Sequence, residues 1–483
     1  MELNLNTCKQ AWLSKDARFD GKFFIGVKTT GVYCRPVCPV KSPKFKNVIF
    51  FKTAAQAGNS GYRPCLRCRP ETSPGTPVCS GTCAIVSRAL RLIAGGQLNN
   101  NRLADFADRL GITTRHLNRL FITHLGASPN AVAQNQRLHA AKRLLDETDL
   151  SMIDVALCSG YNSLRRFNAH IKQTYGITPT QLRRSKFHKT APDRSGHYVF
   201  KLPYRPPYNW QHMLDFLSTR ATPGVEQVLD NKYIRTIGTQ EKPGLIKVSC
   251  DQEKNQLICK IHTSQTESLL AIIEKIKCIF DLGADPQIIL SRLKTDKKLW
   301  QLVNKNPGLR VPGCWDGFEI AVRSITGQQV SVVGATTVMG RIVNQYGVPS
   351  KLNSNVSYLF PTPRALAELD PTSLPMPRAR ANAIATIARS VVSGELNLDP
   401  GQDSSEMIQK LVSLKGIGPW TAQYIAMRAL AEPDALLEGD LVLEKKAAQL
   451  YGLNERMKTR ELLARSEVWR PWRAYASIHI WNL

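Results

Sequence analysis

The stretch LVSLKGIGPWTAQY, residues 411–424, determines the interpretation of the C-terminal half of the chain. Its first part has the pattern of a helix end, and the turn Gly416-Ile417-Gly418 follows it. Pro419 suits the first position of a second helix, because its fixed φ is helical and its missing N–H would have no acceptor there. The stretch therefore predicts two helices joined by a tight glycine turn.

A glycine turn at a helix start suits a phosphate oxygen, because the first N–H groups are unpaired and the helix dipole favours negative charge. Such a helix–hairpin–helix binds the DNA backbone without regard to sequence. Asp440 follows twenty residues after Trp420, although phosphates repel a carboxylate. We therefore interpret Asp440 as a residue that takes part in chemistry. The alternative is an ordinary helix N-terminal residue, and Glu438 is a weaker candidate for the same role.

The composition favours a polyanionic partner. The chain has 483 residues, enough for about three domains, and its formal net charge is +27. It has no run of eighteen apolar residues, and residues 1–6 lack the layout of a signal peptide. We expect no membrane association and a cytoplasmic, bacterial-type, nucleoid-associated protein. Its twelve cysteines should be mostly reduced, so that clustered cysteines are metal ligands or nucleophiles.

Four cysteines have the spacing of a zinc site. They form two close pairs on proline-containing turns: Cys34 with Cys38, and Cys65 with Cys68. Two such pairs separated by a longer loop suit tetrahedral thiolate coordination of Zn²⁺. Residues 23–27 and 47–51 are expected to be strands. Unrelated buried cysteines are the alternative, and we apply that interpretation to Cys79 and Cys83, which have no matching second pair.

The motifs KTTGVYCRPVC, residues 28–38, and GYRPCLRC, residues 61–68, resemble the N-terminal domain of the Ada methylation-response proteins. The resemblance implies that Cys34 accepts a methyl group from a methylphosphotriester in DNA. A metal-bound thiolate is deprotonated at neutral pH yet remains nucleophilic. Its methylation would remove one negative charge and so weaken the repulsion of DNA. The predicted phosphate contacts beside the ligands are Arg35, Arg63, Arg67 and Lys41; solvated surface charges are the alternative.

Apolar residues recur at helical spacing from about residue 82 to 188. Residues 103–121 predict a helix-turn-helix in which Gly111 makes the turn and Thr113 caps the second helix. Residues 152–170 predict a second such unit. The segment resembles the AraC/XylS double helix-turn-helix family, whose two recognition helices enter successive major grooves.

This resemblance implies a set of base-reading side chains on the two recognition helices. They are Thr114, Arg115, Asn118, Arg119, Leu164, Arg165 and Asn168, while Leu117, Phe121 and Phe167 are expected in the core. Arg165 and its neighbour Leu164 depart from the small polar residues usual in the family, so the operator sequence does not carry over. The histidines of this segment have no metal-ligand grouping, and we assign them to packing or the helix surface.

The third segment begins with alternating stretches that predict a small antiparallel sheet, and from about residue 285 the pattern becomes helical. The predicted strands are 197–202, 233–237, 245–248 and 256–261. The motifs YRPPYNW (204–210), AVRSITGQQVS (321–331) and RPWRAY (470–475), taken with the hairpin, resemble AlkA. AlkA is the 3-methyladenine DNA glycosylase II of the helix–hairpin–helix superfamily.

On this resemblance, Asp440 is the carboxylate that stabilises positive charge on the sugar or orients water. A cationic flipped base would meet aromatic faces; the matching positions are Trp420, Tyr424, Trp481 and Phe216, for which core packing is the alternative. Related enzymes that also cleave the backbone have a Schiff-base lysine at the position of Trp420. Because tryptophan cannot form a Schiff base, the resemblance predicts a monofunctional glycosylase, which does not cleave the backbone.

Further residues are expected to contact DNA around the lesion. The hairpin contributes Lys415, Gly416 and Gly418. Gln328 and Gln329 occupy the region where the relative inserts a wedge into the duplex, and Gln329 replaces its leucine. A glutamine can fill the gap in the duplex, but it offers less apolar area than the leucine of the relative.

The expected fold class is multidomain α+β. The predicted segments are 1–75 (zinc methyl-acceptor domain with four cysteine ligands), 82–188 (double helix-turn-helix), 197–285 (α+β glycosylase subdomain) and 286–483 (helix–hairpin–helix glycosylase domain), joined by linkers 71–82 and 185–196. The predicted function is DNA alkylation-damage response: excision of alkylated bases plus a methyl-activated transcription switch. The expected partners are double-stranded DNA and RNA polymerase, and the cofactor is Zn²⁺.

Two other functions compete with this prediction. One is a transcription regulator whose C-terminal half binds DNA without catalysis, and the other is a bifunctional glycosylase–lyase. The sequence Pro-Cys-His-Arg does not occur in the chain. The second acceptor cysteine of longer Ada proteins is therefore missing, and no repair of O6-methylguanine is expected.

Overall fold

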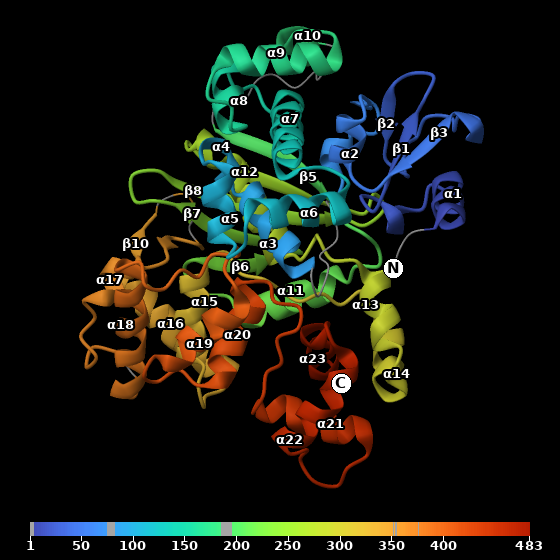
Figure 1. Ribbon diagram of the computed structural model, residues 1–483. Helices are drawn as coiled ribbons and strands as arrows, with labels where there is room; N and C mark the ends of the chain where they lie inside the picture. Colours follow the sequence, from blue (N-terminus) through green and yellow to red (C-terminus); the bar gives the residue numbers. More distant parts are fainter. Residues whose placement is uncertain (1–3, 75–82, 185–195, 351, 353–354, 375) are drawn as a thin grey trace. The chain divides into compact units, whose positions relative to one another are not determined.

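The computed structural model describes residues 4–74, 83–184, 196–350, 352, 355–374 and 376–483 (Figure 1). The chain forms two compact units. The first comprises Met1–Pro206, Cys250–Glu274 and Leu282–Asp285, and the second comprises Pro207–Ser249, Lys275–Asp281 and Pro286–Leu483. Most of the two predicted linkers and Cys79 lie outside the described residues.

A four-stranded sheet forms the N-terminal part of the first unit, in the order β3-β1-β2-β4. Its strands are β1 (Phe24–Val27), β2 (Val32–Cys34), β3 (Val48–Phe51) and β4 (Arg63–Pro64). β1 pairs antiparallel with β2 and β3, whereas β2 pairs parallel with β4. The accompanying helices are α1 (Leu5–Leu13), α2 (Ala54–Asn59), η1 (Ala17–Phe19), η2 (Phe45–Asn47) and η3 (Pro70–Thr72). The two strands predicted here are confirmed as β1 and β3.

The next described residues of the first unit, 83–184, are helical, as the segment's periodicity predicts. The helices are α3 (Cys83–Ala94), α4 (Gln97–Asn100), α5 (Leu103–Arg109), α6 (Thr114–Leu125), α7 (Pro129–Glu147), α8 (Met152–Cys158), α9 (Leu164–Tyr175) and α10 (Pro179–Arg184). Gly111 has a positive φ of 73° between α5 and α6, and the Thr113 side chain accepts a hydrogen bond from the His116 N–H. Leu117, Phe121 and Phe167 are fully buried, which confirms their prediction as core residues. Each such side chain contributes about 1.5–3 kcal/mol through burial.

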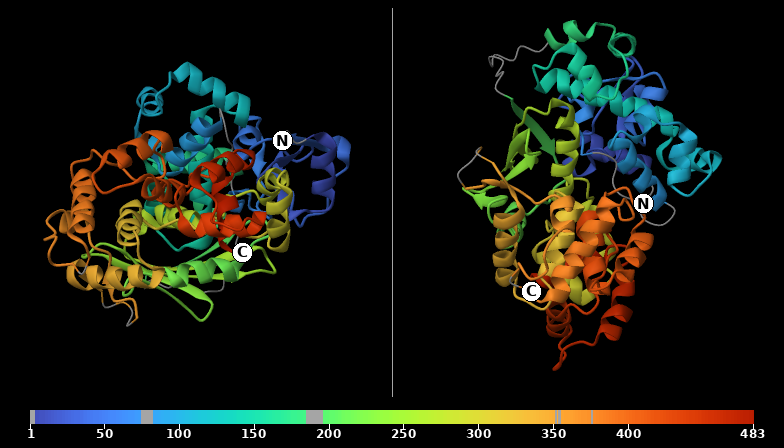
Figure 2. Two further views of the ribbon diagram at one scale, coloured as in Figure 1. Left: turned by 90° about the horizontal axis from the view of Figure 1, so that it is seen from below. Right: turned by 90° about the vertical axis from the view of Figure 1, so that its left-hand side faces the viewer.

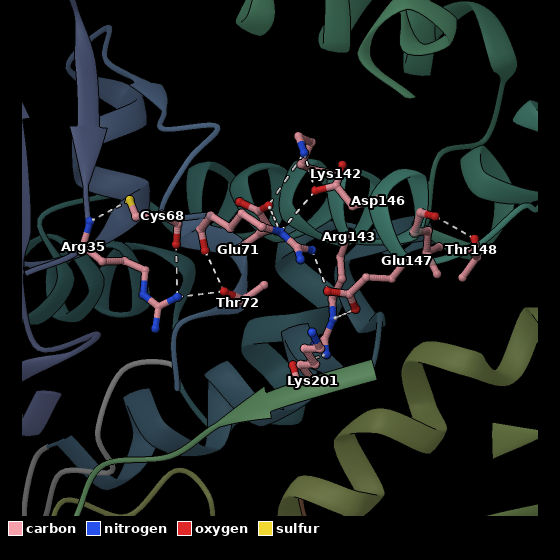
Figure 3. A network of polar contacts seen from close by, with 12 residues as sticks. Arg35, Cys68, Glu71, Thr72, Lys142, Arg143, Asp146, Glu147, Thr148 and Lys201 are labelled. Atoms are coloured by element: carbon pink, nitrogen blue, oxygen red, sulfur yellow. Dashed lines mark hydrogen bonds and ion pairs between the residues drawn. The ribbon is translucent and has the colours of Figure 1, made fainter. Parts of the chain in front are cut away.

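A buried set of charged side chains joins the region after β4 to α7 (Figure 3). It contains three cations and three carboxylates: Arg69, Lys142 and Arg143 with Glu71, Asp146 and Glu147. The Lys142 ammonium contacts Asp146 and lies 3.9 Å from Glu71. The pKa of Glu71 is raised by burial, against the lowering effect of Lys142 and Arg69. Buried charges of this kind require their partners, because desolvation leaves each one costly when alone.

Two strands and part of one helix complete the first unit. β5 (His197–Pro203) pairs antiparallel with β9 (Gln256–His262) along its whole length. The turn η4 (Thr266–Ser268) leads into α12 (Leu269–Ile279). Both strands coincide with predicted ones.

The second unit contains an antiparallel meander of β6 (Glu226–Leu229), β7 (Lys232–Gly238) and β8 (Pro243–Asp251), preceded by α11 (Trp210–Thr219). β7 and β8 confirm two further predicted strands. β6 was not predicted: its residues Glu-Gln-Val-Leu alternate too weakly to mark a strand.

Helices form the remainder of the second unit. They are α13 (Pro286–Leu293), α14 (Lys297–Lys305), α15 (Gly317–Thr326), α16 (Val332–Tyr346), α17 (Pro363–Ala367), α18 (Arg378–Val392), α19 (Ser404–Ser413), α20 (Pro419–Ala429), α21 (Leu441–Tyr451), α22 (Thr459–Ser466), η5 (Glu467–Trp469) and α23 (Arg473–Trp481), with a short hairpin of β10 (Val348–Pro349) and β11 (Tyr358–Leu359). α15 packs against α18 and α20, and α19 packs against α20 (Figures 1 and 2). Among the described residues, no helix is both long and apolar enough to span a lipid bilayer.

Candidate active site and DNA-binding surfaces

A cavity of about 500 Å³ opens in the second unit beside the glycine hairpin. Five residues that the sequence singled out line it together: Asp440, Trp420, Tyr424, Trp481 and Phe216. They come from α11, α20, the start of α21 and the end of α23, which are far apart in the sequence. The size falls within the range of small-molecule sites, so the cavity is large enough for a single nucleobase.

The Asp440 carboxylate is held by donors from two helices. It caps α21, and its Oδ1 accepts a hydrogen bond of 2.7 Å from the Leu443 N–H. Its Oδ2 accepts a bond of 2.9 Å from the Trp420 indole Nε1–H. Asp440 is therefore both a helix N-cap and a cavity residue, so the two interpretations of this residue are compatible. Two donors fix the orientation of the carboxylate, which is half-buried at the cavity wall.

The aromatic wall of the cavity is ordered by stacking and by arginines. The rings of Trp420 and Tyr424 are stacked, with centroids 5.3 Å apart and planes inclined by 13°. Arg428 donates a hydrogen bond of 2.6 Å to the Tyr424 hydroxyl oxygen. The guanidinium of Arg220 lies over the Phe216 ring, 4.0 Å from its centroid. One face of Phe216 therefore already holds a cation supplied by the protein.

The sequence reasoning missed the arginines around the cavity. Arg220 and Arg323 line it, and Arg428 lies behind Tyr424. Arg323 and Arg428 are only 9% and 5% exposed. Their sequence signal is a charged residue on the apolar face of a helix, since their neighbours in α15 and α20 are almost all buried.

The hairpin has the predicted form, with α19 ending at Ser413 and α20 beginning at Pro419. Gly416 has a φ of +90°, and a Cβ there would lie 2.9 Å from the Cβ of Ala383, so this position requires glycine. Gly418 is the N-cap of α20. The first N–H groups of the helix lack intrahelical acceptors, as a phosphate contact requires, and Lys415 is exposed beside them.

The two glutamines after α15 differ in their surroundings. The side-chain amide of Gln328 donates to the Gly416 carbonyl and to the Thr421 hydroxyl, each at 3.0 Å. Gln328 thus braces the hairpin from outside. Gln329 is exposed and has a φ of +55°, a strained conformation for a side chain of this type. Its wedge role stays a prediction.

The four predicted zinc ligands converge in the first unit. The sulfurs of Cys34, Cys38, Cys65 and Cys68 all lie within 4.8 Å of one another. Sulfur ligands lie about 2.3 Å from Zn²⁺, so this thiol set fits one shared ion. Hydrogen bonds from the neighbouring thiols lower the pKa of Cys65, and hydrogen bonds within the same cluster raise the pKa of Cys68.

The four thiols are not equally accessible. Cys38, Cys65 and Cys68 are buried, whereas Cys34, at the end of β2, is half-buried. A substrate therefore has its best access to Cys34.

Arg35 does not lie where the sequence suggested. Its backbone N–H donates to the Cys68 sulfur at 3.4 Å, and its guanidinium donates to the Thr72 hydroxyl (Figure 3). The guanidinium also binds the Asp20 carboxylate. The side chain is only 9% exposed. The predicted contact of Arg35 with DNA is therefore corrected: the residue is an internal brace of the cysteine cluster, because Asp20 provides it with a buried partner. Arg63 is half-buried and Arg67 is exposed, so both remain candidates.

The recognition-helix side chains face solvent to different extents. Those of Arg115, Arg119, Arg165 and Asn168 are exposed at the helix surface, and those of Thr114 and Asn118 are half-buried. The helices that carry them, α6 and α9, each begin with a capped N-terminus. This placement is compatible with base contacts, which stay a prediction.

The fold and sites together define a class: a DNA-binding protein with a thiolate metal centre, a pair of helix-turn-helix units and a helix–hairpin–helix base-excision domain. Four family models match the chain. They are the metal binding domain of Ada (residues 7–71), a helix-turn-helix domain (106–185), the AlkA N-terminal domain (199–316) and the HhH-GPD superfamily base excision DNA repair protein (322–472). The cysteine cluster is accordingly a Zn²⁺ site.

The full chain is 39% identical to the probable bifunctional transcriptional activator/DNA repair enzyme AlkA of Mycobacterium tuberculosis, of which 97% is covered. The chain belongs to this family of bifunctional transcriptional activators and DNA repair enzymes. Over 59% of its length it is 33% identical to DNA-3-methyladenine glycosylase 2 of Escherichia coli, of which 96% is covered. The fold of 59% of this chain matches a 3-methyladenine DNA-glycosylase from Archaeoglobus fulgidus, of which 97% is covered, with a TM-score of 0.53 and 21% sequence identity.

Proposed function

We propose that the second unit hydrolyses the N-glycosidic bond of alkylated bases of the 3-methyladenine type in double-stranded DNA. The observation that carries this proposal is the Asp440 carboxylate, held by Trp420 and Leu443 at the wall of a base-sized aromatic cavity. The relative from Escherichia coli, named as a 3-methyladenine glycosylase, supports the substrate class.

The proposed reaction requires the base to leave its stack and enter the cavity. The bond between C1′ and the base nitrogen breaks, and its electron pair goes to the base. Asp440 stabilises the positive charge that develops on the sugar. The oxygen of a water molecule then bonds to C1′, and one proton of that water is released to the solvent. An alkylated purine is already cationic, so it leaves as a neutral molecule without prior protonation. Trp420 cannot form a Schiff base, and the DNA strand is left intact at an abasic site.

Release of the free base from methylated duplex DNA tests this function. Chromatography of the soluble products should reveal alkylated purines, while the DNA strand stays whole until alkali cleaves it. If strand breaks without alkali accompany base release, and borohydride traps a protein–DNA adduct, the protein is a bifunctional lyase. If no base is released, the second unit is a non-catalytic DNA-binding module of a regulator.

We also propose that Cys34 is the methyl acceptor of a stoichiometric methylphosphotriester repair reaction. Zn²⁺ bound by the four cysteines keeps their sulfurs deprotonated at neutral pH. The Cys34 sulfur attacks the methyl carbon, so that a carbon–sulfur bond forms while the carbon–oxygen bond of the phosphotriester breaks. The products are a thioether and a phosphodiester anion. The greater exposure of Cys34 relative to the other three ligands supports this choice.

Peptide masses after exposure to methylated DNA test the acceptor. We expect one added methyl group on Cys34; the same mass on Cys38 would overturn the assignment. The methylated protein should then bind promoter DNA more tightly through α6 and α9, and we propose that it activates transcription by contacting RNA polymerase. Transcription from a responsive promoter with purified polymerase, with methylated and unmethylated protein, checks that step.

A further inference from the structure

A second cavity, of about 710 Å³, lies within the first unit, between the region of the cysteine cluster and the second helix-turn-helix. Its walls come from four parts of the chain: the segment from α2 to β4, the helix α4, the helix α7, and the segment that leads from α8 into α9. α7 packs against α2 and α4, and α9 packs against β4, so these elements enclose one space. Its size is that of a site for a small molecule and exceeds what a single ion requires.

The lining of this cavity is cationic. It contains the arginines Arg63, Arg137 and Arg166 and one histidine, and it contains no aspartate or glutamate. Among the residues that the structure describes, none of the three guanidiniums forms an ion pair. The buried Arg35 of the same unit, in contrast, has Asp20 as its partner. Three cations that face one space repel one another, and an anion with several oxygen atoms would offset this repulsion.

Arg137 is anchored so that part of its guanidinium remains available. Its Nη1 donates to the Leu98 carbonyl and to the Asn99 side-chain oxygen, each at 3.3 Å. The pKa of His170, another lining residue, is lowered by burial and by Arg137, which reflects how near the guanidinium lies to the cavity side of α9. Both anchors of Arg137 are neutral acceptors, and a guanidinium has five N–H groups, so donors remain for a ligand.

The place of the cavity on α9 separates it from the predicted DNA surface. The residues of this helix that line the cavity are Arg166, His170, Gln173 and Thr174. The residues of this helix that are predicted to read bases are Leu164, Arg165 and Asn168. At about 100° per residue, the two sets lie on roughly opposite sides of the helix. A DNA groove that receives the reading side is therefore directed away from the cavity, and a small anion from solution is the occupant that fits.

We propose that this cavity binds a phosphorylated small molecule of nucleotide size that carries at least two negative charges. Its phosphate oxygens accept hydrogen bonds from Arg137 and Arg166. Arginine suits this role, because its planar set of N–H groups matches phosphate oxygens in pairs. Arg63, at the start of β4, closes the opposite wall. The ligand therefore bridges the region of the cysteine cluster to α9 and holds the two together against the repulsion of their cations.

Isothermal titration calorimetry of the full-length, zinc-loaded protein tests the site, with ATP, inorganic pyrophosphate and adenosine as the probes. We expect ATP and pyrophosphate to bind, and adenosine, which is uncharged, not to bind. Arg166→Met removes an exposed side chain and should leave the fold intact, and Arg137→Met removes the anchored guanidinium. Each substitution should weaken the binding of both anions roughly 10-fold or more, because a hydrogen bond to a charged group is lost.

The matched control is Arg165→Met, which removes the same charge from the neighbouring exposed position of α9, outside the cavity. It should leave the affinity for ATP at the wild-type value. Equal losses in Arg165→Met and Arg166→Met would show attraction by net charge alone and would overturn the proposal. Unchanged affinity in Arg166→Met, adenosine binding as tight as that of ATP, or a wild type that binds neither anion would do the same. Thermal unfolding of all variants monitors folding.

A second arm of the experiment distinguishes a free ligand from the DNA backbone, since both present phosphate oxygens. ATP is titrated into wild-type protein that has been saturated with an undamaged DNA duplex. We expect the same affinity for ATP as in the absence of DNA, because the cavity lies on the side of α9 opposite the predicted reading side. Displacement of ATP by the duplex would assign the cavity to DNA phosphates and overturn the proposal.

Discussion

Replacing Trp420 by phenylalanine isolates the hydrogen bond that positions the Asp440 carboxylate. The change removes the Nε1–H, which donates to Asp440 Oδ2 at 2.9 Å, and keeps a ring that can stack on Tyr424. A hydrogen bond to a charged group contributes about 1.5–3 kcal/mol, which corresponds to roughly 10- to 100-fold in rate. The lower half of this range is expected, because the Leu443 N–H still holds the other oxygen at 2.7 Å.

Single-turnover excision from methylated duplex DNA at saturating enzyme is the assay, since it separates the chemical step from binding and product release. The same substitution should cost little when it is introduced into Asp440→Asn, because residues that act as a unit have non-additive effects. An unchanged rate in Trp420→Phe would refute the positioning role. An equal loss in the two backgrounds would show that Trp420 acts on the base and not through Asp440.

Three other predictions concern the first unit. Removal of Zn²⁺ by a chelator should abolish methyl transfer to Cys34, measured by peptide mass, and leave base excision intact. The Nε2 of His139 lies 2.7 Å from the Tyr33 hydroxyl, and burial lowers the pKa of His139 to about 4. The neutral imidazole therefore stabilises the fold fully above its unfolded pKa of about 6.5, and this stabilisation is lost as the pH falls towards 4. This loss is about 3 kcal/mol. The free energy of unfolding, measured by urea titration, should therefore depend less on pH across that range in His139→Gln than in the wild type. Lys142→Met should lower the free energy of unfolding by about 3–5 kcal/mol, because Asp146 and Glu71 lose the more deeply buried of their two cations, Arg69 being the other, and a thermal melt would check it.

Periodic patterns made much of the fold predictable. Alternating stretches identified β5, β7, β8 and β9. Burial alternates along β5 and β9, so one face of each is more buried than the other, whereas the five central residues of β7 are all buried. The helix-turn-helix followed from helical spacing together with Gly111 and Thr113, whose conformations the turn and cap require. The convergence of the four cysteines followed from ligand spacing. Each of these features is encoded within a short stretch.

Features that depend on distant partners could not be predicted. Arg35 belongs to a basic motif, and only the fold reveals that Asp20 pairs with it in the interior. Arg220 and Arg323 lie far apart in the sequence, and the cavity alone brings them to one wall. Gln328 likewise reaches across to Gly416 in another segment. Single-residue patterns carry no information about such pairings.

The substitution Asp440→Asn tests the central claim, that this chain is a glycosylase, most directly. Asparagine has nearly the same shape and caps a helix as well as aspartate does, so the bond to the Leu443 N–H and the fold should persist while the negative charge is lost. The measurement is the single-turnover rate of base release from methylated duplex DNA, beside DNA binding and thermal unfolding of the same variant. We predict a rate that is lower by a factor of roughly 100 or more, with binding and unfolding close to wild type. Equal release by the wild type and Asp440→Asn would contradict the account.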